Sequence, residues 1–444
     1  MQWLGGGVGS SQLPEGFVWG AAASAYQIEG AVREDGRGEG IWDRFCLRPD
    51  AIKDGSDASV ACDHYHRYRE DIELMQQLSL SAYRFSISWP RVLPTGTGRI
   101  NSAGLDFYDR LVEALLQAGL RPFATLYHWD APRALQDRWG GWAHRDMAEA
   151  FGEYADAVTR RLGDRVGDWL TLHAPSVQAW YGHGTGRHAP GVRKPHLFPA
   201  VAHHLLLGHA RALPIVRQNC PGARAGVALA LSPIYPRRDE DEEAAFLYDG
   251  AMNRLFLDAL YRGATPRDVL DRLDGETPWI RSGDLAAIAA PLDHLDICYV
   301  TRTVVESDPA HLWPGGRVVS GGCLDDVAGA EAFPEGLYDV LRRVWRDYAP
   351  AAIYATVAGA EDEDVVGADG TVRDTRRLGH LREHLAVVEQ AIGEGIPVRG
   401  YFAQPLLDDF AWTAGFTLRR GLIYHNRLTQ GRLVKESGYW YALH

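Results

Sequence analysis

Short apolar runs alternate with longer amphipathic segments along most of this chain. Where apolar residues recur every three or four positions, the pattern predicts helices over residues 103–117, 147–162, 198–217, 246–261 and 378–392, the last closed by Gly393. Eight shorter runs have the length and composition of strands: 17–22, 83–87, 122–126, 169–172, 226–231, 295–299, 353–356 and 398–403. Eight strands separated by helices predict an α/β fold, a single-domain (β/α)8 TIM barrel.

Length and composition favour one domain. The chain has 444 residues, 46% of them apolar, which is enough to bury the core of such a barrel. No linker, repeat or change of composition divides residues 13–444. The glycine-rich opening at residues 1–12 is interpreted as a disordered tail or a cloning remnant.

Charge and cysteine content narrow the class of protein. A net charge of −12 without a basic cluster argues against nucleic-acid partners and anionic membranes. The five cysteines (46, 62, 220, 298 and 323) are odd in number and lack metal-ligand spacing, so we expect reduced thiols, no metal and no cofactor. Neither a long apolar run nor a signal peptide is apparent, which favours a cytoplasmic protein. The oligomeric state is left open.

Several motifs follow one another in order along the chain. They include Tyr-Arg-Phe-Ser-Ile-Ser-Trp-Pro-Arg at 83–91, Thr-Leu-Tyr-His-Trp-Asp at 125–130 and Ser-Gly-Tyr-Trp-Tyr at 437–441. These motifs resemble those of glycoside hydrolase family one. The resemblance extends over roughly residues 13 to 442. It implies a TIM barrel whose chemistry lies at the C-terminal ends of the strands.

The same resemblance places both catalytic carboxylates of the family at positions that have changed. The family's Thr-Leu-Asn-Glu-Pro, with the acid/base, reads Thr-Leu-His-Ala-Pro at 171–175, and its Ile-Thr-Glu-Asn-Gly, with the nucleophile, reads Ala-Thr-Val-Ala-Gly at 355–359. Ala174 and Val357 thus stand at the two glutamate positions. Because a retaining glycosidase needs two carboxyl groups about 5 Å apart, we expect a pseudoglycosidase without that chemistry.

Other positions of the sugar site are partly retained. The resemblance implies substrate-binding roles for seven residues, two of them (299 and 404) within motifs that have otherwise diverged: Gln27, Arg84, His128, Trp129, Tyr299, Gln404 and Trp412. Residues 174, 300, 357, 358 and 411 are smaller or less polar than their family counterparts. We therefore expect a wider, more apolar pocket that binds a small molecule at the C-terminal mouth of the barrel.

Three polar residues are candidates for new catalytic groups. His173 is the strongest, because a histidine with a pKa near 6.5 serves as acid or base at neutral pH. Asp409 could orient it or act itself, and Cys298 is a candidate nucleophile. The alternative for each is a hydrogen-bonded wall residue.

These observations leave three functions open. The favoured one is a repurposed, non-hydrolytic enzyme that catalyses a proton transfer (cyclisation, dehydration, isomerisation or epimerisation) on a bulky molecule in bacterial secondary metabolism. The second is a non-catalytic glycoside-binding pseudoenzyme. The third is a β-glycosidase that uses non-standard residues. Whether the protein is an enzyme is thus left open, with a repurposed activity favoured over hydrolysis.

Overall fold

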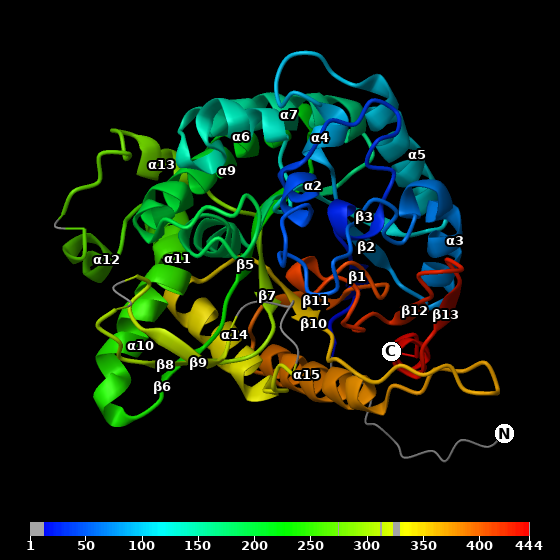
Figure 1. The fold of residues 1–444 in the computed structure, drawn as a ribbon. Helices are drawn as coiled ribbons and strands as arrows, with labels where there is room; N and C mark the ends of the chain where they lie inside the picture. Colours follow the sequence, from blue (N-terminus) through cyan, green and yellow to red (C-terminus); the bar gives the residue numbers. More distant parts are fainter. Residues whose placement is uncertain (1–12, 274, 311–312, 323–328, 444) are drawn as a thin grey trace.

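The predicted (β/α)8 barrel is confirmed. The computed structural model describes residues 13–273, 275–310, 313–322 and 329–443, so the tail predicted at residues 1–12 and Cys323 lie outside it. Eight parallel strands close the barrel in the order β1-β11-β10-β7-β5-β4-β3-β2 (Figure 1). Their bounds are β1 Val18–Ala22, β2 Ala82–Ser86, β3 Arg121–Tyr127, β4 Asp168–His173, β5 Arg224–Ala230, β7 His294–Tyr299, β10 Ile353–Ala358 and β11 Val398–Gln404.

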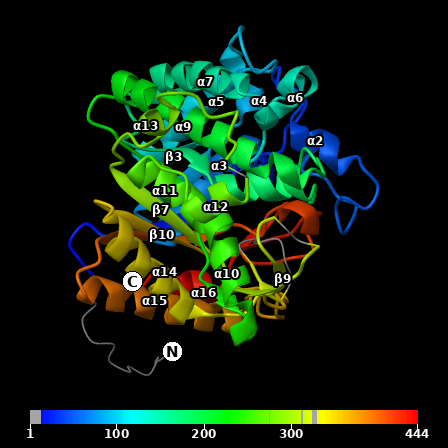
Figure 2. The ribbon, with the colours of Figure 1, turned by 90° about the vertical axis from the view of Figure 1, so that its left-hand side faces the viewer.

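Helices surround the barrel on all sides (Figure 2 shows α5, α7 and α9 on one side of the strands and α14 and α15 on the other). Four predicted helices are present, namely α5 (Ser102–Gln117), α7 (Asp146–Leu162), α9 (Phe198–Asn219) and α15 (Thr375–Gly393). The remaining α-helices are α1 (Ala25–Ile28), α2 (Ile41–Cys46), α3 (His64–Gln77), α4 (Trp89–Val92), α6 (Arg133–Trp139), α8 (Pro175–Val177), α12 (Arg267–Asp271), α13 (Asp284–Ile288), α14 (Pro334–Tyr348) and α16 (Glu436–Tyr441).

The helix predicted over 246–261 is interrupted. It forms α10 (Glu242–Asp249), a π-helical turn η5 (Gly250–Arg254) and α11 (Leu255–Arg262). Arg254 in this turn pairs with Asp249 and with Asp268 of α12. The π-turn thus lies where Arg254 forms ion pairs with two aspartates. The spacing of apolar residues in the sequence does not reveal such an interruption. A second π-turn, η2 (Gln178–Gly184), follows α8.

Two small sheets lie outside the barrel. β6 (Ile234–Pro236), β8 (Thr303–Glu306) and β9 (Arg317–Gly321) form one, and β12 (Ile423–His425) and β13 (Arg432–Val434) form the other. These strands have three to five residues, too few for a period to appear in the sequence. Short 3-10 turns complete the chain: η1 (Gly141–Ala143), η3 (Pro195–Leu197), η4 (Asp239–Asp241) and η6 (Trp412–Ala414).

The barrel interior is filled by side chains in layers. Phe123, Tyr354 and Phe402 contact one another edge to face, with ring centroids 5.0–6.0 Å apart. The guanidinium of Arg84 lies 5.5 Å from the ring of Phe402. This aromatic layer is therefore the floor on which the polar groups of the mouth rest.

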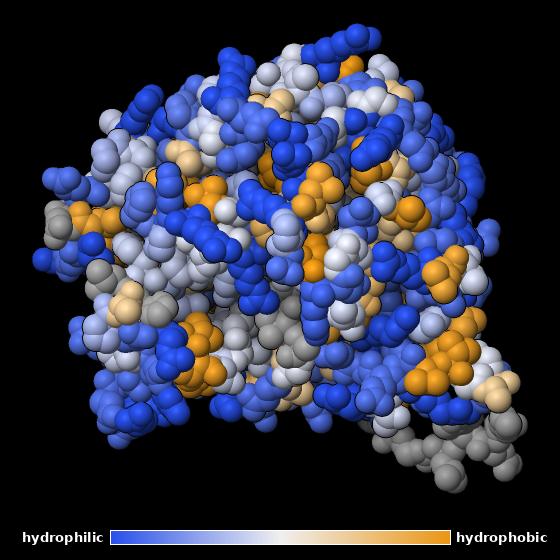
Figure 3. Space-filling model, in the orientation of Figure 1, coloured by the Kyte–Doolittle hydropathy of each residue, from blue (hydrophilic) through white to orange (hydrophobic). Residues whose placement is uncertain are grey.

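The face of the molecule seen in Figure 3 is mostly hydrophilic. In the space-filling view, apolar residues form small separate groups among hydrophilic ones (Figure 3). In the described part of the chain, no helix has both the length and the apolar character needed to cross a membrane.

Candidate functional site

Polar and aromatic side chains from four strand ends meet at the C-terminal mouth of the barrel. His128 and Trp129 directly follow β3, His173 ends β4, and Cys298 lies in β7. Trp412 comes from the turn η6 after β11. The structure thus brings together most of the residues that the sequence analysis singled out.

A buried ion pair occupies the centre of the site. Arg84 Nη1 donates to an Asp296 carboxylate oxygen and, at 2.7 Å, to Thr356 Oγ1. Arg84 Nη2 donates to Gln404 Oε1 at 3.0 Å, and Thr356 Oγ1 donates to the other Asp296 oxygen at 2.8 Å. The side chains of Arg84 and Asp296 are only 3% and 2% exposed. Arg84 is therefore neutralised by the protein itself, which limits what it offers to a ligand.

Asp296 and Thr356 were missed by the sequence analysis. Asp296 lies two residues before Cys298 in β7, so both side chains point to the same side of the strand, into the barrel. A carboxylate inside the run His-Leu-Asp-Ile-Cys-Tyr at 294–299 was the available signal. Buried carboxylates in strands are paired, and this one could have been matched with Arg84.

Two imidazoles stack beside this ion pair. The rings of His128 and His173 are 3.8 Å apart between centroids and inclined by 19°. Burial lowers the pKa of His173 well below its ordinary value, and the neighbouring His128 and Arg84 lower it further. Burial and Arg84 lower the pKa of His128 in the same way. At neutral pH both rings are therefore uncharged. The same lowered pKa means that the imidazole of His173 resists protonation, so it is a weaker base here than an exposed histidine.

Cys298 is the polar neighbour of His173. The Cys298 Sγ lies 3.8 Å from His173 Nδ1 and 3.8 Å from Asp296 Oδ1. A thiol beside a neutral imidazole is the arrangement in which the imidazole can take the thiol proton. The structure thus places two of the candidate residues, His173 and Cys298, side by side. A catalytic role for either stays a prediction.

The aromatic residues of the mouth pack on one another. The ring of Trp412, which is fully buried, lies 4.8 Å from Trp129 and 4.6 Å from Trp42, and it stacks on Tyr26 at 6.1 Å. Trp129 Nε1 donates to the backbone oxygens of His173 and Ala174 at 3.0 and 3.3 Å. These rings therefore contact side chains where a ligand surface was expected.

The space left at the centre is small. A cavity of about 20 Å³ remains between Trp129, His173, Ala174, Ala230, Cys298, Tyr299, Val300, Thr356, Ala358 and Gln404. By this measure about 10–15 Å³ is enough for one water molecule, so the cavity holds a water but no sugar ring unless side chains move. The expected wider pocket is thus not found in this structure, because neighbouring rings fill the space beside the small residues at 174 and 358.

The other candidate residues make internal contacts. Gln27 Nε2 donates to the Phe410 oxygen at 3.0 Å, and Gln27 Oε1 accepts from Ser24 at 2.7 Å. The Tyr299 hydroxyl donates to the Phe333 oxygen at 2.6 Å. Asp409 is 4% exposed and does not line the small cavity. Val357, at the predicted nucleophile position, is 1% exposed.

Metal ligation has no support from the described residues. Within them, no three His, Cys, Asp or Glu side chains come together in a way that could hold a metal ion.

Comparison with known proteins gives consistent matches over the whole chain. The sequence profile described as "Glycosyl hydrolase family 1" matches residues 9–443. Beta-glucosidase A of Thermotoga maritima is 41% identical over 436 residues, which is 97% of each chain, and Thermostable beta-glucosidase B of Thermobispora bispora is 43% identical over 98% of this chain and 90% of that protein. The solved structure of a beta-glucosidase from Thermotoga maritima in complex with glucoimidazole superimposes with a TM-score of 0.92 at 41% identity, covering 98% of both chains.

These matches overturn the favoured functional hypothesis. A repurposed, non-hydrolytic enzyme of secondary metabolism was inferred from changes at the mouth, yet the full-length relatives are named β-glucosidases. The inference was wrong because it gave a handful of strand-end positions, among them 174 and 357, more weight than the rest of the chain. Identity of about two residues in five over the entire barrel leaves no doubt about descent: the chain belongs to glycosyl hydrolase family 1.

Proposed function

We propose that this chain is a β-glycosidase that acts on β-glucosides with non-standard residues at the mouth of its barrel. The observation that carries the proposal is the identity of 41% with Beta-glucosidase A of Thermotoga maritima over 97% of both chains. The residues at the centre support it, since Arg84, His128, Trp129 and Trp412 lie together at the strand ends. Cleavage requires that the packed rings separate to admit the sugar.

His173 and Cys298 are the groups that we assign to the reaction. Neither Ala174 nor Val357 can donate or accept a proton, so the two glutamates implied by the resemblance have no ionisable replacement in place. In one route, His173 takes the proton of a water whose oxygen bonds to the anomeric carbon, and it returns that proton to the glycosidic oxygen as the bond from this oxygen to the anomeric carbon breaks. In the other, His173 moves the proton of the Cys298 thiol, 3.8 Å away, to the leaving glycosidic oxygen as the sulfur bonds to the anomeric carbon, and water displaces the sulfur in a second step. Because general acid/base catalysis by a well-placed carboxyl contributes about 10²–10⁴ in rate, we expect turnover slower than that of an intact relative by at least this factor.

A cytoplasmic location forms part of the proposal. Four cysteines of the described part are free, at positions 46, 62, 220 and 298. Reduced thiols are typical of the cytosol, where disulfides rarely persist.

Hydrolysis of p-nitrophenyl β-glucoside tests the function. We expect measurable release of nitrophenol by the purified protein. The rate of release should fall by about 10²-fold or more in His173→Gln, and it should also fall in Cys298→Ala. His66→Gln and Cys220→Ser are matched controls, because His66 is an exposed residue of α3 and Cys220 is a buried cysteine at the end of α9.

Two outcomes would contradict the proposal. Equal activity in the wild type and in His173→Gln would point to a contaminating enzyme. Binding of glucoimidazole without any turnover would indicate a protein that holds glycosides but does not cleave them.

A further inference from the structure

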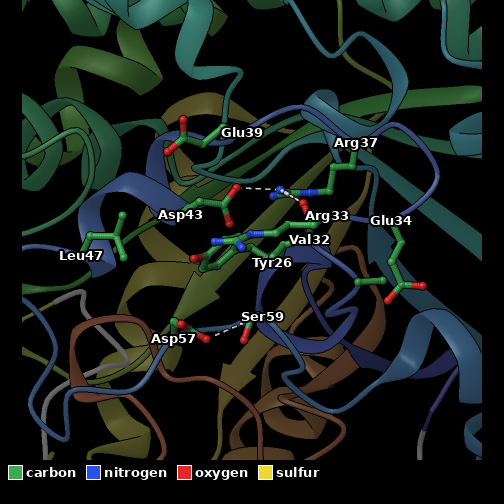
Figure 4. Close-up of a pocket in the computed structure, with 11 residues that line it drawn as sticks. Tyr26, Val32, Arg33, Glu34, Arg37, Glu39, Asp43, Leu47, Asp57 and Ser59 are labelled. Carbon is green, nitrogen blue, oxygen red and sulfur yellow. Dashed lines mark hydrogen bonds and ion pairs between the residues drawn. The ribbon is translucent and has the colours of Figure 1, made fainter.

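A much larger cavity lies outside the centre of the mouth. It has a volume of about 790 Å³ and is open to solvent, against about 20 Å³ at the centre. Small-molecule sites are typically 300–1,000 Å³. Its walls come from the segments after β1 (Figure 4), and its lining consists of Tyr26, Ala31, Val32, Arg33, Glu34, Arg37, Glu39, Asp43, Leu47, Asp57 and Ser59. We call this cavity the outer cleft.

One wall of the outer cleft is rigidly held. Arg37 Nη1 donates to Asp43 Oδ2 at 2.6 Å and to the backbone oxygens of Val32 and Gly38 at 3.2 and 3.1 Å. Arg37 Nη2 donates to Asp130 Oδ2 at 3.3 Å, and the Arg37 side chain is 3% exposed. A cleft whose wall is fixed before a ligand arrives loses less conformational entropy on binding.

A second arginine of the lining, Arg33, is available for a ligand. It is exposed, reaches across the cleft in the view of Figure 4, and makes no ion pair or hydrogen bond with any residue that the structure describes. The nearby carboxylates are already engaged with other groups: Glu34 with His66, Glu39 with Arg133, and Asp57 with the Ser59 amide. Arg33 is thus a guanidinium donor that the described part of the fold does not use.

We propose that the outer cleft binds a neutral saccharide. A cation would face Arg33, and an anion would face four carboxylates, so neither charge suits the whole lining. Sugar hydroxyls donate to carboxylates and accept from guanidinium groups, which satisfies both kinds of group at once. The apolar C–H face of a sugar can pack on Val32 and on Leu47, which is 64% exposed. The site does not depend on hydrolysis at the barrel centre.

Calorimetric titration with the non-hydrolysable thio-linked analogue of cellobiose tests this site. We expect wild-type protein to bind it with a Kd on the order of 1 mM and Arg33→Met to bind it at least about tenfold more weakly. Arg399→Met is the control, because Arg399 is exposed near the N-terminal end of β11, at the opposite end of the barrel. Binding should persist in His173→Gln and in protein saturated with glucoimidazole.

The proposal fails in three ways that the experiment separates. It is wrong if the wild type gives no binding heat, if Arg33→Met binds as tightly as Arg399→Met, or if glucoimidazole abolishes binding. Failure of nitrophenyl glucoside hydrolysis would contradict the proposed function but would leave this site intact.

Discussion

The centre of the mouth and the outer cleft leave very different amounts of space. At the centre, imidazole and indole rings lie 3.8–4.8 Å apart and leave about 20 Å³. In the outer cleft, charged side chains pair at the walls and leave about 790 Å³. Aromatic rings gain dispersion energy by filling space, whereas charged groups lose hydration when they close on one another. Smaller residues at a site therefore need not enlarge it, if flat rings stand beside them.

The largest expected effect is the loss of the central ion pair. Arg84→Met leaves Asp296 buried without its guanidinium partner and should lower the free energy of unfolding by about 3–5 kcal/mol. Chemical denaturation measures this loss. The double variant Arg84→Met/Asp296→Leu should recover part of it, because no unpaired charge remains. If the free energy of unfolding of Arg84→Met lies within roughly 1 kcal/mol of the wild-type value, water must reach Asp296 in spite of its burial.

The stacked imidazoles should make stability depend on pH. The pKa of His128 and of His173 is lowered in the fold, so both stay neutral while the unfolded chain takes up protons below about pH 6.5. Their contribution is therefore fully present above that pH and is lost as the pH falls, by about 1.4 kcal/mol per pH unit for each ring.

Urea denaturation between about pH 7.5 and 5.5, on either side of the ordinary histidine pKa, measures how the free energy of unfolding depends on pH. The variant His128→Gln/His173→Gln should show a shallower slope than wild type, while the other buried histidines supply an unchanged background. Identical slopes would mean that the two rings are already exposed to solvent in the folded protein.

A carboxylate restored at position 174 should destabilise the closed centre. Ala174 is 1% exposed and borders the cavity of about 20 Å³, so Ala174→Glu must displace the packed rings or bury a charge. We expect a loss of about 1–3 kcal/mol in unfolding free energy, without recovery of full glucosidase activity. Ala174→Gly is the control, since the backbone here has a φ of 45°, which glycine adopts freely. An unchanged stability for Ala174→Glu would indicate an open site in solution.

The smallest effect is expected at the outer cleft. Arg33 and Leu47 are exposed, so Arg33→Met and Leu47→Ser should each change the free energy of unfolding by less than about 0.5 kcal/mol. Thermal unfolding followed by circular dichroism provides the check. A larger loss would mean that these side chains hold the cleft in shape, and weakened saccharide binding in Arg33→Met would then need another explanation.

The barrel could be predicted from the sequence, but the packing of aromatic rings at its mouth could not. Strand and helix periods are local, so the eight strands and four of the five helices could be read directly. Which residues reach the mouth also follows from strand ends, as His173 and Cys298 illustrate. Ring packing does not follow, because the contact of Trp412 with Trp42 and Trp129 depends on loop paths that no local pattern encodes.

The outer cleft illustrates the same limit. Its wall depends on Arg37 meeting Asp130, which is 93 residues further along the chain. Gly40 allows this approach, since a Cβ atom there would overlap the Asp130 carboxylate. Nothing in the residues near position 37 indicates that Arg37 meets Asp130. Neither the cleft nor its volume could therefore be inferred from the sequence.

Asp130 connects the outer cleft to the centre of the mouth. One of its oxygens accepts from Arg37 at the wall of the cleft, the other accepts from the Trp42 amide, and the residue itself follows Trp129 in the chain. Linkage between two binding sites is reciprocal. If a saccharide in the cleft changes the affinity of the barrel centre for an inhibitor through this carboxylate, the inhibitor must change the saccharide affinity by the same factor.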